Sequence, residues 1–231
     1  MTRPRVYVGM SGGVDSSVAA ALSLDQDYDV TGVYMKNWSQ DLPGMQCPWA
    51  EDLADAKRVA VQLGIDFKVF DFETQYRQKV VDYMLDEYRA GRTPNPDIMC
   101  NQEVKFKLFL ETSLAAGADY IATGHYARVE RLADTARLLR ARDDDKDQTY
   151  FLYRVTSEAL AKTVFPLGNL TKPEVRQIAK DRGLWTARKK ESMGVCFVGN
   201  VGMREFLSQY ITTRPGDIID KESGRVLGRH D

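Results

Sequence analysis

The sequence has 231 residues, and its 32 basic and 33 acidic residues leave a formal net charge of −1. This balance excludes the overall basic field that is typical of many nucleic-acid-binding proteins, so an RNA partner would need a local patch. No stretch approaches 18 consecutive apolar residues and no apolar leader precedes the first strand, so we expect a cytoplasmic protein with no membrane span. The three cysteines, Cys47, Cys100 and Cys196, are odd in number and widely spaced, which favours buried, catalytic or ligating thiols over a disulfide framework.

Strand and helix patterns alternate along the first half of the chain. Short apolar runs predict strands at residues 6–10, 30–35, 67–72 and 119–126. Helical apolar spacing predicts helices at residues 16–24, 50–63, 74–90 and 101–116, the last three followed by glycine. This alternation predicts an α/β fold with an open, mostly parallel, doubly wound sheet, although the strand order cannot be deduced. Ligands of such sheets bind outside the carboxyl ends of the strands.

The stretch SGGVDS follows the first predicted strand and opens the first helix. Gly12 and Gly13 allow a close approach of the backbone, so that successive N–H groups and the helix dipole can face an anion. Ser11, Ser16 and Ser17 would add hydroxyl donors, and Asp15 could hold Mg²⁺ or orient the loop. A plain strand–turn–helix connection is the alternative. The context favours a phosphate-binding loop, yet the Lys of the GK[ST] pattern is missing.

A second marked segment, GRTPNPDIMCNQEVKF, spans residues 91–106. Its two prolines predict a rigid, extended approach, and Cys100 is expected where the next helix begins, a position that stabilises a thiolate. A small buried residue is the alternative for Cys100. Cys196, in the short apolar run of ESMGVCFVG, would on its own be a core residue.

The segment SGGVDS resembles the PP-loop of the ATP pyrophosphatases, a fold of the adenine nucleotide alpha hydrolase-like type, which split ATP into AMP and pyrophosphate. Both cysteine segments further resemble those of the tRNA-specific 2-thiouridylase family (MnmA/TrmU type). The same holds, in the right order along nearly the whole chain, for GVYMKNW, TGHYARV, KDQTYFLY, FPLGNLTKPEVR and MREFL.

This resemblance implies a role for each matching residue. It places ATP on Gly9, Met10, Ser11, Gly12, Gly13, Val14, Asp15, Ser16, Met35 and Gly124. It makes Cys100, Cys196 and Asp97 the catalytic residues. It assigns RNA contacts to Asn95, Pro96, Asp97, Lys146, Asp147 and Gln148. His125, at a strand end, is either a core-edge residue or a residue that faces the target nucleotide, and we expect the second.

The implied reaction is the ATP-dependent conversion of a wobble uridine in tRNA to 2-thiouridine. Adenylation turns the position-2 carbonyl oxygen into a leaving group, and sulfur arrives as a persulfide on Cys196 from a donor protein of a sulfur relay. Cys100 releases the sulfur or closes a disulfide with Cys196. ATP and Mg²⁺ are then required and no protein-bound metal is expected. An iron–sulfur cluster held by Cys100, Cys196 and Asp97 is the alternative mechanism. Cys47 is a conceivable further ligand, but we expect a loop or helix-start residue. We also expect a monomer.

The resemblance divides the chain into a catalytic domain, residues 1–200, and the start of a middle domain, residues 201–231. Full-length members of the family continue into a C-terminal β-barrel, which we expect to be absent here because the sequence stops at GRVLGRHD. Met193 stands where the family usually has a small polar residue. For the tRNA surface, the run Arg188-Lys189-Lys190 suits phosphate contacts, whereas the basic residues between 128 and 146 are interleaved with acidic ones and fit a solvated hairpin.

Two other enzyme classes and one non-enzymatic class share the PP-loop pattern. An amide-forming PP-loop ligase, such as tRNA lysidine synthetase, would not depend on Cys100 and Cys196. A tRNA cytosine thiolase would carry paired CxxC motifs, which this sequence lacks. A degenerate nucleotide- or tRNA-binding module would bind ATP without consuming it.

Overall fold

The computed structural model describes residues 2–41, 47–132, 135–190, 202–212 and 214–230. A five-stranded parallel sheet forms the centre of the molecule, in the order β3-β2-β1-β4-β7. The strands are β1 (Arg5–Gly9), β2 (Asp29–Lys36), β3 (Asp66–Asp71), β4 (Tyr120–Ala122) and β7 (Thr163–Val164). The predicted open, parallel α/β sheet is therefore confirmed. The chain leaves β1 toward β3 on one side and returns beside β1 as β4, so the order reverses between β1 and β4.

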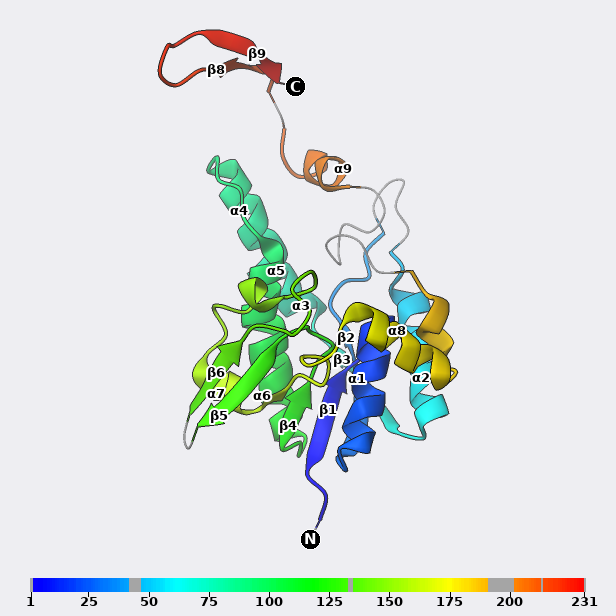
Figure 1. Cartoon of the computed structure of the whole chain (residues 1–231). Helices are drawn as coiled ribbons and strands as arrows, with labels where there is room; N and C mark the ends of the chain where they lie inside the picture. The colour runs from blue at the N-terminus through cyan, green and yellow to red at the C-terminus, as the bar shows by residue number, and fades with distance from the viewer. Residues whose placement is uncertain (1, 42–46, 133–134, 191–201, 213, 231) are drawn as a thin grey trace.

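Helices cover both faces of the sheet (Figure 1). One face packs against α1 (Val14–Asp25), α2 (Trp49–Leu63) and α8 (Lys172–Asp181). The other face packs against two long helical runs. These are α3 (Glu73–Tyr76), η1 (Arg77–Asp82) and α4 (Tyr83–Arg89), then α5 (Pro96–Met99), η2 (Cys100–Leu108) and α6 (Phe109–Ala115). Because both faces are covered, the side chains on both sides of β1 are buried. Val6 and Val8 lie in one core and Tyr7 lies in the other.

Of the described elements that follow β4, only β7 joins the parallel sheet, at its edge. An antiparallel hairpin joins β5 (Arg128–Leu132) and β6 (Thr135–Leu139), as expected from its interleaved charges. After it come η3 (Thr149–Phe151), α7 (Ser157–Ala161) and η4 (Trp185–Arg188). Strand β7 has only two residues, which is too short for an apolar pattern to reveal.

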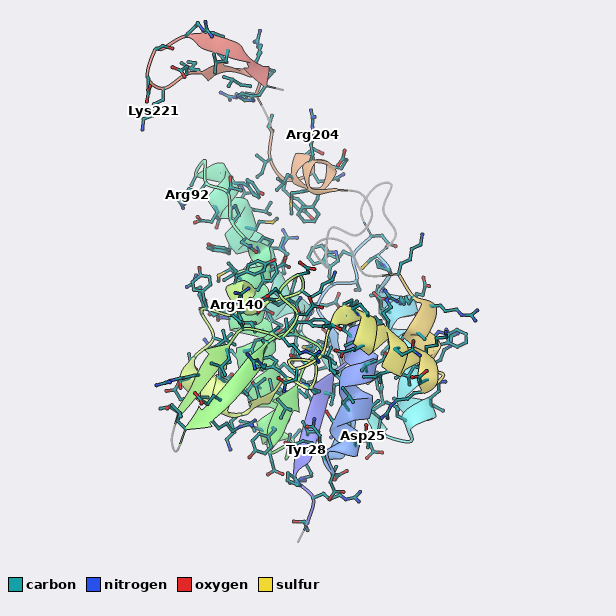
Figure 2. The ribbon with its side chains drawn as sticks, in the orientation of Figure 1. Asp25, Tyr28, Arg92, Arg140, Arg204 and Lys221 are labelled. Carbon is teal, nitrogen blue, oxygen red and sulfur yellow. The ribbon has the colours of Figure 1, made fainter. Side chains whose placement is uncertain are left out.

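The C-terminal segment begins with α9 (Met203–Ser208), whose Phe206 is buried against Trp38 at 6.4 Å between ring centroids. Beyond it, β8 (Gly216–Ile219) and β9 (Val226–His230) form an antiparallel hairpin that lies apart from the parallel sheet (Figure 1). In Figure 2, Lys221 marks this hairpin, and Asp25 and Tyr28 mark the opposite end of the molecule, where the N-terminus lies. Among the described residues, no helix combines the length and apolar character needed to cross a membrane.

Candidate functional site

The loop between β1 and α1 is fixed from two sides by close backbone contacts. Gly12 has φ +73°, and a Cβ atom there would lie 2.3 Å from the carbonyl oxygen of Asp52 in the first turn of α2. A Cβ atom on Gly124, just after β4, would lie 2.9 Å from the backbone nitrogen of Ser16. Both positions therefore require glycine, and together they hold the loop at the point where the strand order reverses.

The N-terminus of α1 carries no side-chain cap. Its N-cap residue is Gly13, which has no side chain to accept the first-turn N–H groups. The hydroxyls of Ser16 and Ser17 donate to the Gly13 carbonyl at 3.1 and 2.8 Å, and Ser16 Oγ also accepts from the Ser11 N–H at 3.2 Å. The serines predicted as phosphate donors thus hold the loop in shape in this state. The open helix end and its dipole remain available to an anion.

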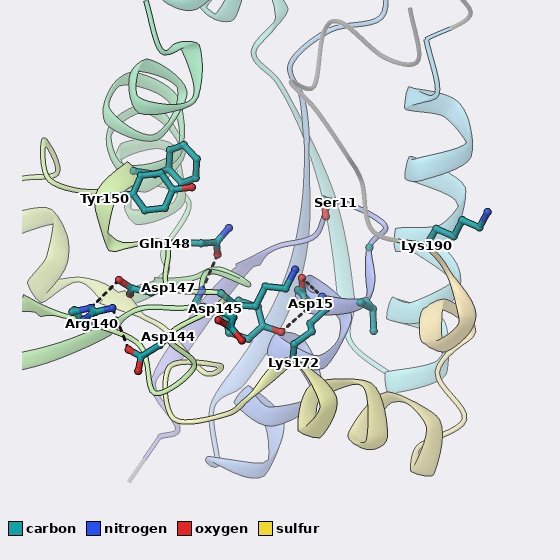
Figure 3. Close-up of a pocket in the computed structure, with 15 residues that line it drawn as sticks. Ser11, Asp15, Arg140, Asp144, Asp145, Asp147, Gln148, Tyr150, Lys172 and Lys190 are labelled. Carbon is teal, nitrogen blue, oxygen red and sulfur yellow. Dashed lines mark hydrogen bonds and ion pairs between the residues drawn. The ribbon is translucent and has the colours of Figure 1, made fainter. Parts of the chain in front are cut away.

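A cavity of about 620 Å³ opens in front of this loop (Figure 3). The loop residues Ser11, Gly13, Val14 and Asp15 line one side of it. The remaining lining residues are Tyr126, Arg140, Asp144, Asp145, Lys146, Asp147, Gln148, Tyr150, Phe151, Lys172 and Lys190. The cavity therefore joins the predicted ATP loop to the predicted RNA segment Lys146-Asp147-Gln148.

Lys172 is one of the residues of this cavity that the sequence analysis does not identify. It is the first residue of α8, and its Nζ lies 2.7 and 2.8 Å from the two carboxylate oxygens of Asp15. The side chain of Lys172 is 11% exposed, that of Asp15 33%. Tyr126 Oη donates to the same carboxylate at 3.0 Å. Asp15 is thus held by a cation that lies 157 residues away in the sequence, a separation at which no local motif can link the two.

Asp147 and Gln148 build the opposite wall of the cavity. Asp147 accepts from the Ala141 N–H, from Thr149 Oγ1 and from Arg140. Burial alone would raise the pKa of Asp147, but these hydrogen bonds outweigh it and hold that pKa below the usual value. Gln148 Oε1 accepts from the Tyr126 N–H at 2.9 Å. Both side chains therefore make hydrogen bonds within the protein, and their contact with RNA remains a prediction.

Tyr150, which follows this segment, presents an aromatic ring to the cavity. Tyr150 is 60% exposed, and the centroid of its ring lies 4.0 Å from that of Phe151. The Phe151 carbonyl accepts from Asn101 Nδ2 at 3.4 Å. Since Asn101 follows Cys100, this wall of the cavity is joined directly to the helix that carries the predicted nucleophile.

That helix begins at Pro96, four residues before the predicted start at Cys100. The reason is local: Pro96 occupies the first helical position, and Asn95 Oδ1 accepts from the N–H groups of Asp97 and Ile98 at 3.0 and 3.4 Å. Cys100 is 4% exposed and is the first residue of the π-helical segment η2. The prediction that Cys100 stands at the helix start is therefore wrong by one turn.

Asp97 lies three residues before Cys100, so both side chains project from the same side of the helix. Burial raises the pKa of Asp97, and the nearby Lys105 only partly opposes this. A carboxyl group with a raised pKa is suited to accept or donate a proton near neutral pH.

His125 lies in the core beside the cavity. It is 8% exposed, its ring packs against Phe106 and Phe165, and its Nδ1 lies 2.8 Å from Thr123 Oγ1. Burial, with a smaller contribution from Lys105, lowers the pKa of His125 well below its usual value, so the ring is neutral. This geometry matches the core-edge alternative, and a contact with the target nucleotide remains a prediction.

The remaining predicted residues are dispersed around this rim. Met35 lies at the carboxyl end of β2, with its Cε 3.0 Å from the position of a Cβ on Gly9. Within the run Arg188-Lys189-Lys190, Lys189 Nζ binds Asp52 and Asp55 at 2.8 and 2.7 Å, whereas Lys190 lines the cavity. Cys47 lies beside Trp38. Cys196 and Met193 lie outside the described residues, so the cysteine pair and the cluster alternative both remain predictions.

Comparison with known proteins agrees with this fold. A family model described as the tRNA methyl transferase HUP domain matches residues 4–200. The chain is 56% identical over 227 residues to the tRNA-specific 2-thiouridylase MnmA of Bacillus velezensis; this match covers 98% of the chain and 61% of that relative.

Among solved structures, a 4-thiouridine synthetase–RNA complex with bound ATP aligns with a TM-score of 0.52 and 18% identity, covering 89% of this chain and 50% of that one. The NMN synthetase of Francisella tularensis aligns with a TM-score of 0.51 and 16% identity, covering 91% and 79%. These two alignments support the fold alone. The family match over residues 4–200, together with the high identity to the 2-thiouridylase, shows that the chain belongs to the tRNA methyl transferase HUP domain family.

Proposed function

We propose that this chain is the catalytic part of an ATP-dependent tRNA 2-thiouridylase. The observation that carries the proposal is the arrangement of the cavity. The uncapped N-terminus of α1 lies on one side of it, and the opposite wall is hydrogen-bonded to the Cys100 helix through Asn101 and Phe151. The first feature suits the phosphates of ATP, and the second brings a candidate nucleophile to the same rim. The 56% identity to a protein named tRNA-specific 2-thiouridylase supports the same assignment, although the chain spans only 61% of that relative's length.

The first step of the proposed reaction is adenylation of the uridine. The position-2 carbonyl oxygen attacks the α-phosphate of ATP, the bond between the α- and β-phosphates breaks, and pyrophosphate leaves. The loop from Gly9 to Ser16 grips that leaving group through backbone N–H groups, and Met35 and Gly124 border the adenine side. The carboxylate on the loop that could hold Mg²⁺ is Asp15, whose oxygens bind Lys172 and Tyr126 in this state. Mg²⁺ would neutralise charge on the phosphates.

The second step replaces the activated oxygen with sulfur. The terminal sulfur of a persulfide on Cys196 attacks carbon 2 of the uridine, and AMP leaves with the original oxygen. The Cys100 thiolate then attacks the inner sulfur of Cys196, which releases 2-thiouridine and leaves a Cys100–Cys196 disulfide that an external thiol must reduce. Asp97, with its raised pKa, is placed to move a proton during these steps. The sulfur comes from a persulfide donor protein.

Recognition of the RNA is assigned to the cavity wall opposite the loop and to the start of the Cys100 helix, which is bonded to that wall. Asn95, Pro96 and Asp97 would meet the target uridine, and Lys146 would contact a phosphate. The exposed ring of Tyr150 offers a stacking surface to a base of the anticodon loop.

The proposal is tested with the purified chain, a tRNA that has a wobble uridine, ATP and a protein persulfide donor. Nucleosides from the digested tRNA are analysed by mass spectrometry. We expect 2-thiouridine at the wobble position with release of one AMP for each sulfur transferred, and no product from a tRNA with wobble cytidine. Lysidine-like or amide products, or AMP release without any sulfur in the RNA of the wild-type reaction, would contradict the proposal.

A further inference from the structure

The loop that faces the cavity has no lysine of its own, although phosphate-binding loops of the GK[ST] type use one to neutralise the terminal phosphates. Lys172 supplies a lysine at the corresponding place. It is brought there by α8, which packs on α1 through Val175 and Ala179 in the same core as Val14 and Val18.

We infer that Lys172 is the phosphate-binding lysine of this site and that Asp15 is its counter-ion in the nucleotide-free state. On binding of Mg·ATP, the Lys172 ammonium moves from the Asp15 carboxylate to a phosphate oxygen, and Mg²⁺ takes its place beside Asp15. This inference rests on the proposed use of ATP and goes beyond it, because neither the PP-loop pattern nor the resemblance assigns a role to Lys172.

Burial is the first argument for this exchange. Lys172 is 9% exposed overall, and its Nζ makes two short contacts to Asp15 at the mouth of the cavity. A buried ammonium group that stands beside a helix N-terminus would be costly without an anion, and the Asp15 carboxylate supplies one. Phosphate oxygens that arrive at the same helix end provide a second anion of higher charge within reach of the same Nζ.

The environment of Asp15 is the second argument. Tyr126 Oη donates to Asp15 Oδ1 and keeps the carboxylate oriented when its cation changes. The Tyr126 ring also lies 5.7 Å from Lys172 Nζ, so the ammonium stays in contact with one aromatic face. The backbone of Lys172 is fixed separately: its N–H donates to Asp143 at 2.7 Å, and Thr171 and Glu174 form a capping box. The side chain can therefore change partners without movement of α8.

The test measures equilibrium binding of nucleotides to the protein without RNA, so its readout does not depend on catalysis. The ligands are adenosine and an ATP analogue with a methylene bridge between the α- and β-phosphates, each with Mg²⁺ and with EDTA. Lys172→Met, which keeps the length but loses the charge, should weaken binding of the analogue by about 10- to 100-fold. Binding of adenosine should not change, and Lys172→Arg should restore part of the lost affinity.

Two further variants separate a phosphate contact from other effects. Lys180→Met removes the same charge from the other end of α8 and should leave both affinities unchanged. Asp15→Asn removes the counter-ion, so in EDTA it should bind the analogue at least as tightly as the wild-type protein, whereas it should gain less affinity from Mg²⁺.

Each result decides between the proposals. Equal affinity of the wild-type protein and Lys172→Met for the analogue, or an equal loss for adenosine, would overturn this inference while leaving the use of ATP intact. Weaker binding by Asp15→Asn in EDTA would overturn the exchange. A wild-type protein that binds no analogue under any condition would overturn both this inference and the proposed function.

Discussion

Two helix N-termini at the rim of the sheet differ in how they are capped. The N-cap of α1 is Gly13, which offers no side chain to the first-turn N–H groups, whereas the N-cap of α5 is Asn95, whose Oδ1 accepts from Asp97 and Ile98. The second helix has satisfied its own donors, and the first leaves them for a ligand. The uncapped N-terminus in front of the cavity is therefore the proposed anion site, and the capped one holds Cys100 and Asp97 in place.

The largest expected effect concerns the capped helix. Cys100→Ser should abolish thiolation while the affinity for ATP stays unchanged, because the thiol acts only after adenylation. Cys47→Ser, at the other cysteine among the described residues, should retain most of the activity. The measurement is 2-thiouridine formation beside nucleotide binding. Loss of activity in the Cys47 variant, together with iron in the purified protein, would favour the cluster mechanism.

The next largest effect concerns the loop before α1. Gly12→Ala forces a non-glycine residue to φ +73° and places its Cβ 2.3 Å from the Asp52 carbonyl oxygen, so the loop must shift. We expect ATP binding to be lost and the free energy of unfolding to fall by about 2–5 kcal/mol. Gly64→Ala is the matched control: its φ is +66° but no atom lies within 4 Å, so it should cost only about 1 kcal/mol and leave ATP binding intact. Equal losses in both variants would contradict the close contact.

A substitution at Gly13 tests the comparison between the uncapped N-terminus of α1 and the capped N-terminus of α5. Gly13 has φ −95° and ψ 167°, the conformation of an ordinary N-cap, and its Cβ would meet only Ser11 Oγ, at 3.4 Å. Gly13→Asn should therefore cap α1 as Asn95 caps α5, which leaves stability unchanged or a few tenths of a kcal/mol higher. ATP binding should weaken at least about tenfold because the first-turn donors are taken. Unchanged ATP affinity in a stable variant would show that the open terminus does not bind the nucleotide.

The effect of Asp97 on the free energy of unfolding should depend on pH. Burial raises its pKa in the folded state, so ionisation opposes folding once the pH exceeds the usual value near 3.8. The penalty is absent below that value and complete above the raised pKa. Asp97→Asn should thus stabilise the protein at neutral pH and have little effect near pH 3.8, as measured by urea unfolding at several pH values. A stabilisation of the same size at both ends would mean that the charge is not the cause.

The smallest effect is expected for the cap of α5. Asn95→Ala removes the acceptor for two N–H groups and should cost about 1 kcal/mol of unfolding free energy. Because Cys100 lies one turn further on, thiolation should fall more than ATP binding does. Asn95→Asp, which keeps an acceptor, is the control and should restore the stability.

The sequence predicts those parts of this molecule whose determinants are local. The glycine loop, the strand before it and the helix after it lie within one short segment, so their residue types alone predict the turn and a candidate phosphate site. The predicted start of the Cys100 helix is wrong although Asn95 and Pro96 are ordinary cap and first-turn residues, because two nearby prolines also favour an extended loop.

Long-range features could not be predicted in the same way. The pairing of Lys172 with Asp15 spans 157 residues and depends on how α8 packs on α1. The capping box of Thr171 and Glu174 does signal the start of α8 in the sequence, but nothing in the spacing indicates which loop this helix end approaches. The sequence also does not show whether a polar side chain bonds within the protein or to a ligand, because the same hydroxyl, carboxylate and amide groups can do either. In the structure, internal hydrogen bonds are made by Ser16, Ser17, Asp147 and Gln148.

The site of cleavage in ATP tests the central claim most directly. The chain is incubated with tRNA, a protein persulfide donor and ATP that is radiolabelled at the α-phosphate, and the labelled products are separated by chromatography. A loop that grips departing pyrophosphate predicts tRNA-dependent label in AMP, with none in ADP. Label in ADP would mean that the bond between the β- and γ-phosphates is broken, and it would contradict the assignment of this chain as an adenylating enzyme.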